Sequence, residues 1–186
     1  MTPEEKPGKV GSRREYTGRV INLDIDRVRF PNGKIGELEM IRHSGASAVI
    51  PFLTDPGADD PQILLIRQYR YATDGFIYEI PAGRLEPGEP PEQCAVRELR
   101  EETGCTAAKM EHLYTMYTTP GFTDEKIHLF VATGLASGES SLEADEFVAV
   151  VPTAMSAALA LIKDVTIIDA KTALSIFNFA VFFLGR

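Results

Sequence analysis

The side chains with the clearest capacity for chemistry are four carboxylates within the stretch 91–103. Glu98 is followed three and four residues later by Glu101 and Glu102, and Glu92 precedes them. In a helix, residues three and four apart lie on one flank, so Glu98, Glu101 and Glu102 would gather there and repel one another. A divalent cation would offset that repulsion. Oxygen-only ligands of this kind indicate Mg²⁺, with Mn²⁺ as the second choice.

Arg97 lies beside this cluster and is placed to orient a glutamate through a charge-assisted hydrogen bond. The helix alone leaves an alternative open, because runs of charge are usually solvated faces in which Arg97 and Arg100 are ordinary partners of the glutamates. The preceding loop favours chemistry. Gly83 and Gly88 bracket a turn, and Glu89 comes just before the helix.

The whole stretch 83–105 resembles the Nudix box. That motif has a glycine, five residues, a glutamate, seven residues, and then Arg-Glu-apolar-any-Glu-Glu-any-Gly-apolar. The matching positions are Gly83, Glu89, Arg97, Glu98, Leu99, Glu101, Glu102, Gly104 and Cys105. Cys105 is the one departure, at an aliphatic position where a small buried thiol fits. So many fixed residues at fixed spacing make the resemblance specific.

The resemblance extends to the ADP-ribose pyrophosphatase branch of the Nudix family, from about Tyr16 to the end of the chain. The segments that carry it are Arg67–Arg70, Tyr78–Gly83, Pro120–His128 and Asp145–Val150. It implies metal-dependent hydrolysis of the diphosphate bond of ADP-ribose to AMP and ribose 5-phosphate, or of a related nucleoside diphosphate sugar.

Three alternatives stay open at this point. The substrate could be GDP-mannose or another nucleoside diphosphate compound, because the box binds phosphates and metal and not the base or sugar. A housecleaning hydrolase of nucleoside triphosphates is disfavoured by the N-terminal extension and by Pro120–Glu125. A non-catalytic nucleotide-binding Nudix domain is disfavoured because the box carboxylates are present.

The resemblance also implies a metal site and a general base. Glu98 and Glu102 resemble the main metal carboxylates, with Glu101 in support and the backbone carbonyl of Ala82 as a further ligand. Glu146 occupies the loop where this branch keeps the glutamate that deprotonates the attacking water. Glu143 and Asp145 are close enough in sequence to compete for that role.

Four further residues are implied in substrate binding. Arg70 and Glu86 resemble partners of the diphosphate and the metal site, and Glu79 precedes the turn where the family contacts substrate. Glu125 is the fourth candidate. Considered without the resemblance, Arg70 would pair with a surface carboxylate, Glu79 would face outward from a strand, and Glu125 would be a solvated loop residue.

The elements that must position these residues are predicted from the spacing of apolar residues and from the positions of proline and glycine. Pro90 and Pro91 suit the start of a helix over 91–103, and Gly104 suits its end. The segment 82–90 is predicted as a loop. The other elements are segments in which apolar and polar residues alternate or in which apolar residues are consecutive. Strands are predicted over 16–30, 35–42, 46–53, 62–69, 76–81, 111–118, 126–133 and 146–151, and helices over 153–163 and 170–184.

This order predicts an α/β fold, with a mixed β-sheet sandwiched between helices and an N-terminal β-hairpin extension. The resemblance implies that this is the Nudix fold. The domain boundaries are a flexible tail over 1–15, the hairpin over 16–44 as a dimerisation element, and a Nudix hydrolase domain over 45–186. The resemblance implies a homodimer with swapped hairpins. Val20, Ile21 and Arg42 are then candidates for contact with the substrate's base in the other subunit.

Composition limits the possible partners. The net charge of −8 over 186 residues argues against nucleic acid, which favours a basic face. The apolar run 173–184 is too short to span a bilayer, so no membrane partner is expected. No secretory leader is visible, and Cys94 and Cys105 lack metal-ligand spacing, so a cytoplasmic protein with free thiols is predicted.

Overall fold

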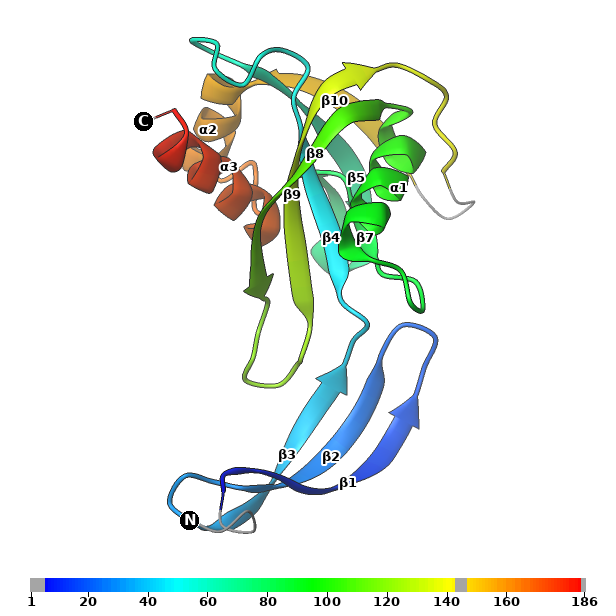
Figure 1. Cartoon of the computed structure of the whole chain (residues 1–186), viewed down its shortest axis with the longest axis vertical. Coiled ribbons are helices and arrows are strands. Elements are labelled where there is room, and N and C mark those ends of the chain that lie inside the picture. The colour runs from blue at the N-terminus through cyan, green and yellow to red at the C-terminus, as the bar shows by residue number, and fades with distance from the viewer. Residues whose placement is uncertain (1–5, 143–146, 185–186) are drawn as a thin grey trace. The chain divides into compact units, whose positions relative to one another are not determined.

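The computed structural model of the chain describes residues 6–142 and 147–184 (Figure 1). The chain divides into two compact units. One consists of Met1–Gly45 with Met116–Lys126, and the other of Ala46–Thr115 with Ile127–Arg186.

The N-terminal unit contains a three-stranded antiparallel sheet in the order β1-β2-β3 (Figure 1). Its strands are β1 (Gly8–Thr17), β2 (Asn22–Arg29) and β3 (Ile35–Arg42). The prediction of a flexible tail over 1–15 is therefore wrong for residues 8–15, and the strand predicted over 16–30 is interrupted by a turn at 18–21. The reason is that β1 is polar and is held by ion pairs, such as Arg13 with Glu37, which hydrophobic periodicity does not detect.

Arg42 is the centre of an ion network in this unit. Its guanidinium donates to Asp24 at 3.0 Å, to Asp124 at 3.1 Å, and to Asp26. Hydrogen bonds from Arg14 and Arg42 lower the pKa of Asp24. Burial works to raise the pKa of Asp26, but hydrogen bonds from Ser12 and Arg42 outweigh it and lower that pKa. Carboxyl groups with a depressed folded-state pKa stabilise the fold above their ordinary pKa, and that stability is lost as the pH falls.

We therefore expect the N-terminal sheet to open in acid. Hydrogen-exchange protection of the β2 and β3 amides should fall as the pH drops through about 4, the ordinary carboxyl pKa, and below it. In Arg42→Met, protection should be lower at pH 7 and should depend less on pH. The exposed Arg27, changed to Met on the same sheet, is the matched control. An Arg42→Met protein with an unchanged pH profile would show that the network does not hold this sheet.

The second unit contains two sheets. In the larger, the strand order is β7-β4-β9-β8, with β4 parallel to β9 and antiparallel to β7; in the smaller it is β10-β5-β6, with antiparallel pairing. Both strand directions occur, so the predicted mixed sheet is confirmed. The strands are β4 (Ala46–Pro51), β5 (Gln62–Arg70), β6 (Gly75–Glu79), β7 (Ala82–Arg84), β8 (Thr106–Tyr117), β9 (Lys126–Ala136) and β10 (Val148–Ala154).

Helices cover these sheets from two sides, with α1 on one side and α2 and α3 on the other (Figure 1). Their bounds are α1 (Pro91–Thr103), α2 (Met155–Lys163) and α3 (Ala170–Phe182), with a short 3₁₀ helix, η2 (Tyr71–Thr73), after β5. The predicted α/β architecture is confirmed. Within the described residues, none of these helices has both the length and the apolar character needed to cross a membrane.

The apolar stripe of α1 packs against the sheets and fixes the helix in place. Ala95 and Leu99 lie in a buried cluster with Val49, Leu64, Phe130, Ala132 and Cys105. Cys105 is 7% exposed, so the thiol fills the position where the motif has an aliphatic side chain. Both cysteines are free, and burial, with the charges of Glu98 and Glu89, raises the pKa of Cys94 to about 11. Glu98 and Glu102 are buried on the same side of α1 as this stripe, so packing of the helix also fixes these two carboxylates.

Candidate active site

The glutamates of α1 differ in burial. Glu98 and Glu102 are 7% and 2% exposed, whereas Glu101 is only partly buried. A buried carboxylate is costly without hydrogen-bond donors or a cation, so each of these side chains requires partners. The partners come from Arg97 on the same helix and from β7 beside it.

Arg97 joins the loop before α1 to the helix glutamates. Its Nε and Nη2 donate to the two carboxylate oxygens of Glu89 at 2.9 and 3.0 Å, and its Nη1 donates to Glu98 at 2.6 Å and to Glu101 at 3.0 Å. The hydrogen bond from Arg97 lowers the pKa of Glu89. The structure therefore brings Glu89, Arg97, Glu98 and Glu101 into one charged cluster.

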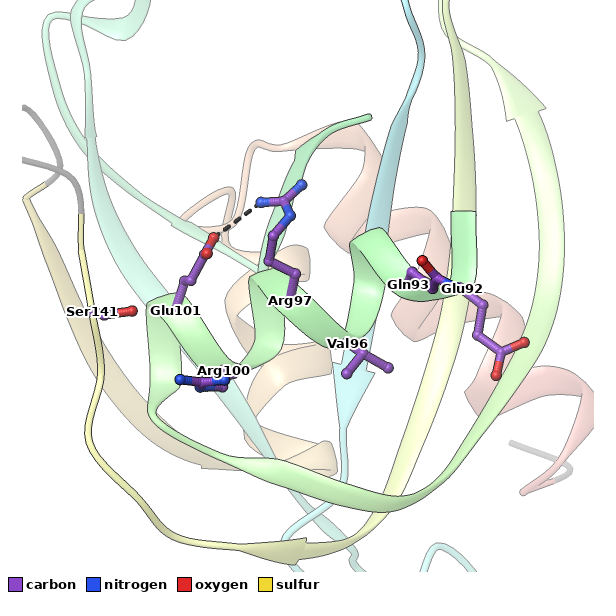
Figure 2. Close-up of a pocket in the computed structure, with 7 residues that line it drawn as sticks. All are labelled: Glu92, Gln93, Val96, Arg97, Arg100, Glu101 and Ser141. Carbon is purple, nitrogen blue, oxygen red and sulfur yellow. Dashed lines mark hydrogen bonds and ion pairs between the residues drawn. The ribbon is translucent and has the colours of Figure 1, made fainter. Parts of the chain in front are cut away.

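A surface hollow of about 490 Å³ borders this cluster. Figure 2 shows Arg97 and Glu101 pointing toward one another and Val96 on another side of α1. The hollow is lined by Glu92, Gln93, Val96, Arg97, Arg100, Glu101 and Ser141. Glu98 and Glu102, the two buried carboxylates, are not among its lining residues.

Strand β7 passes directly over the buried carboxylates. The N–H of Ala82 donates to Glu102 Oε2 at 2.9 Å. A Cβ on Gly83 would lie 1.8 Å from Glu98 Oε1, so only glycine fits there. Pairing of Ser47 with Gly83 holds β7 against β4, and the Ser47 hydroxyl donates to the Pro91 carbonyl at 2.7 Å, which ties the start of α1 to the same strand.

These oxygen donors fit a hard divalent cation by their chemistry. Arg97 supplies the positive charge beside Glu98 and Glu101, and the Ala82 N–H supplies the donor to Glu102. Consistent with these contacts, the described part of the chain contains no set of three acidic, histidine or cysteine side chains gathered as metal ligands. A carboxylate has two oxygens, so each of these side chains can keep its N–H donor and still ligate an ion.

A second charged cluster involves Arg70 at the end of β5 and Glu79 at the end of β6. Arg70 Nη2 donates to Glu79 Oε2 at 2.6 Å, and its Nε lies 3.2 Å from both oxygens. Glu79 is 3% exposed, so it does not face outward. Burial works to lower the pKa of Arg70, but the hydrogen bonds and charge of Glu79, with Glu102 and Asp169, raise it. Arg70 is therefore a fixed cation within electrostatic reach of Glu102.

Residues of α3 complete the second cluster, and the sequence analysis did not single them out. Lys171 Nζ lies 3.3 Å from Glu79 Oε1 and 3.0 Å from Asp169 Oδ2. The Ile80 N–H donates to the Thr172 hydroxyl at 2.9 Å, across 92 residues of sequence. The only sequence signal was a lysine near the start of a strongly apolar helix.

Gln68 was also missed. It is 5% exposed and lies two residues before Arg70 on β5, on the same face of the sheet. Within the described residues its side-chain oxygen has no hydrogen-bond partner. An unpaired buried acceptor beside Arg70 is unusual in a folded protein.

The remaining predicted site residues are Glu86, Glu125 and Glu146. The Glu86 side chain is exposed, although its backbone N–H donates to Glu89 Oε2 at 2.9 Å. Glu125 belongs to the N-terminal unit, where it accepts from the Thr118 hydroxyl at 2.9 Å. Glu146, with Glu143 and Asp145, lies outside the described residues.

The candidates for base contact also belong to the N-terminal unit. The side chain of Val20 is 49% exposed and Ile21 is partly buried. Arg42 is already engaged by three aspartates.

Comparisons with known proteins identify a domain family, relatives in sequence and a similar fold. Residues 43–173 match the NUDIX domain family. The chain is 43% identical to a methanol dehydrogenase activator of Bacillus methanolicus, over 87% of this chain and 85% of that protein. It is 42% identical to an ADP-ribose pyrophosphatase of Bacillus subtilis (strain 168), over 93% of this chain and 91% of that protein.

The fold is similar to the crystal structure of an ADP compounds hydrolase. The TM-score is 0.79 at 24% sequence identity, over 97% of this chain and 95% of that one. At that identity the likeness concerns the fold alone.

Proposed function

Because this chain belongs to the Nudix family, we propose that it hydrolyses the diphosphate bond of ADP-ribose to give AMP and ribose 5-phosphate. The observation that carries the proposal is the complete set of box carboxylates, held with Arg97 against β7. Two relatives of nearly equal identity differ in name, one an activator and the other a pyrophosphatase. The retained carboxylates favour hydrolysis, since binding alone does not require them.

A diphosphate resists hydrolysis because its negative oxygens repel a nucleophile. We propose that Glu98 and Glu102, with Glu101 and the Ala82 carbonyl, hold a divalent cation, Mg²⁺ in preference to Mn²⁺. When bound, that ion neutralises phosphate charge and lowers the pKa of water. The chain's own residues do the rest. Arg97 orients Glu98 and Glu101, and Arg70, fixed by Glu79, donates to the diphosphate and places it for in-line attack.

The substrate assignment is tested by a panel of phosphate compounds with Mg²⁺, scored by release of AMP or GMP. The panel contains ADP-ribose, GDP-mannose, another nucleotide sugar, an ADP-linked dinucleotide and ATP. We expect the highest kcat/KM for ADP-ribose, with Glu98→Gln protein as the background control. A preference for GDP-mannose would support the same hydrolysis reaction but assign GDP-mannose as the substrate. Turnover of ATP alone, or of nothing, would reject the proposal.

The general base is proposed to be Glu146. Glu146→Gln should lower kcat at least about 10²-fold, the lower end of the range for a general base, while Mg²⁺ affinity stays unchanged. Glu143→Gln and Asp145→Asn are matched controls from the same loop. A larger loss of kcat in either variant would assign the role of general base to the residue changed in it.

We also propose a homodimer in which the hairpin region 16–44 serves assembly and 45–186 forms the hydrolase domain. Apolar side chains on both units support this, because Val20, Ile35, Phe177 and Phe182 are 49%, 42%, 46% and 75% exposed in the single chain. Light scattering of the full chain should give twice the 20.4 kDa chain mass. A chain beginning at Gly45 should lose dimerisation and affinity for ADP-ribose. A fully active full-length monomer would exclude a shared site.

A further inference from the structure

Lys171 occupies an unfavourable position for a lysine. It is the second residue of α3, where the positive end of the helix dipole disfavours a cation. Its side chain is only 12% exposed, so it also loses hydration and rotamer freedom. Helix stability therefore does not explain the lysine, and its contacts must.

Those contacts join Lys171 to the partner of Arg70. The ammonium group lies 3.3 Å from Glu79 Oε1, and Arg70 Nη2 holds Glu79 Oε2 at 2.6 Å. One buried carboxylate is thus shared between two cations. On its other side, Lys171 lies 3.0 Å from Asp169, the N-cap of α3.

The charge balance of this group is zero. Arg70 and Lys171 contribute two positive charges, and Glu79 and Asp169 contribute two negative ones. Without Lys171 the balance becomes −1, and Arg70 alone must neutralise Glu79. An anion approaching Arg70 would then be repelled more strongly by Glu79, because Lys171 no longer neutralises part of that carboxylate's charge.

We propose that Lys171 is a positioning residue for substrate binding, which shares the carboxylate of Glu79 and thereby leaves the charge of Arg70 effective toward the substrate's diphosphate. This inference rests on the proposed function, because it takes the diphosphate to lie at Arg70. Lys171 acts through Glu79 and Arg70 and need not touch the substrate.

The test is a charge removal that keeps hydrogen-bond donors for both carboxylates, Lys171→Gln. We expect KM for ADP-ribose to rise about tenfold, the scale of one unit charge at intermediate distance and screening, while kcat changes less than about twofold. Lys171→Arg should restore KM. The exposed Lys163, changed to Gln at the end of α2, is the matched control. If Lys171→Gln does not fold, Lys171→Met is measured in its place.

A double-mutant cycle separates this role from simple anchoring of α3. In an Arg70→Ala background, Lys171→Gln should raise KM no further, because its effect passes through Arg70. If Lys171 only anchors α3, the KM effects of the two substitutions should multiply and kcat should change. Either result would overturn the proposal. So would an unchanged KM in Lys171→Gln.

Calorimetry with inorganic pyrophosphate and Mg²⁺ provides the same comparison without turnover. Wild-type protein that hydrolyses nothing on the panel would end the proposed function. Pyrophosphate affinity about tenfold weaker in Lys171→Gln would then still support the role of Lys171, and equal affinity would refute it.

Discussion

Replacing Glu102 by glutamine should lower kcat about 10⁴-fold, because metal-held charge stabilisation is worth several kcal/mol and each 1.36 kcal/mol corresponds to about tenfold in rate. Glu102 is 2% exposed and accepts a hydrogen bond from the Ala82 N–H at 2.9 Å. A glutamine oxygen can accept the same bond, so the fold should persist while the charge is lost. Glu98→Gln should behave alike.

The control for this change comes from the same helix. Glu92 is exposed and lies about one and two-thirds turns before Glu98, so Glu92→Gln removes an equal charge without touching the cluster. Turnover should be measured over a range of Mg²⁺ concentrations, with circular dichroism as the check on folding. A folded Glu102→Gln protein with near-normal kcat would end the assignment of the metal site to α1.

The parts of this site that sequence reasoning found are those with local signals. The predicted helix over 91–103 has the same limits as α1, because Pro91 and Gly104 determine both ends without tertiary information. Gly104 has a φ of +71°, the left-handed conformation that glycine adopts at a helix end. Helical spacing then placed Glu98, Glu101 and Glu102 on one flank.

The parts that it missed depend on tertiary packing. Strand β7 is three residues long, lies within a segment predicted as a loop, and forms only by pairing with β4. The sharing of Glu79 between Arg70 and Lys171 joins residues 92 positions apart, and no local pattern predicts it. Hydrophobic periodicity does not predict β1, because its side chains are polar and its order comes from ion pairs across the sheet.

The Gly83→Ala variant tests how closely β7 and α1 must approach. The added Cβ would lie 1.8 Å from Glu98 Oε1 and 2.0 Å from its Cδ, far inside van der Waals contact, so the carboxylate must move. β7 cannot yield easily, since its pairing with β4 holds it in place. A misplacement of about 1 Å can cost about 10²-fold in rate. Displacement of a metal carboxylate should cost more, so we expect a loss of kcat approaching that of Glu98→Gln.

The glycine control is Gly57→Ala, where the nearest atom to an added Cβ is 3.4 Å away in an exposed loop. It should leave kcat unchanged. If Gly83→Ala acts by displacing Glu98, the double variant Gly83→Ala with Glu98→Gln should be no slower than Glu98→Gln alone. Multiplied losses would instead mean that the β7 backbone contributes separately, as the Ala82 carbonyl would if it is a metal ligand. A fully active Gly83→Ala protein would show that Glu98 does not need its position under β7, and the site would have to be rebuilt around Glu102.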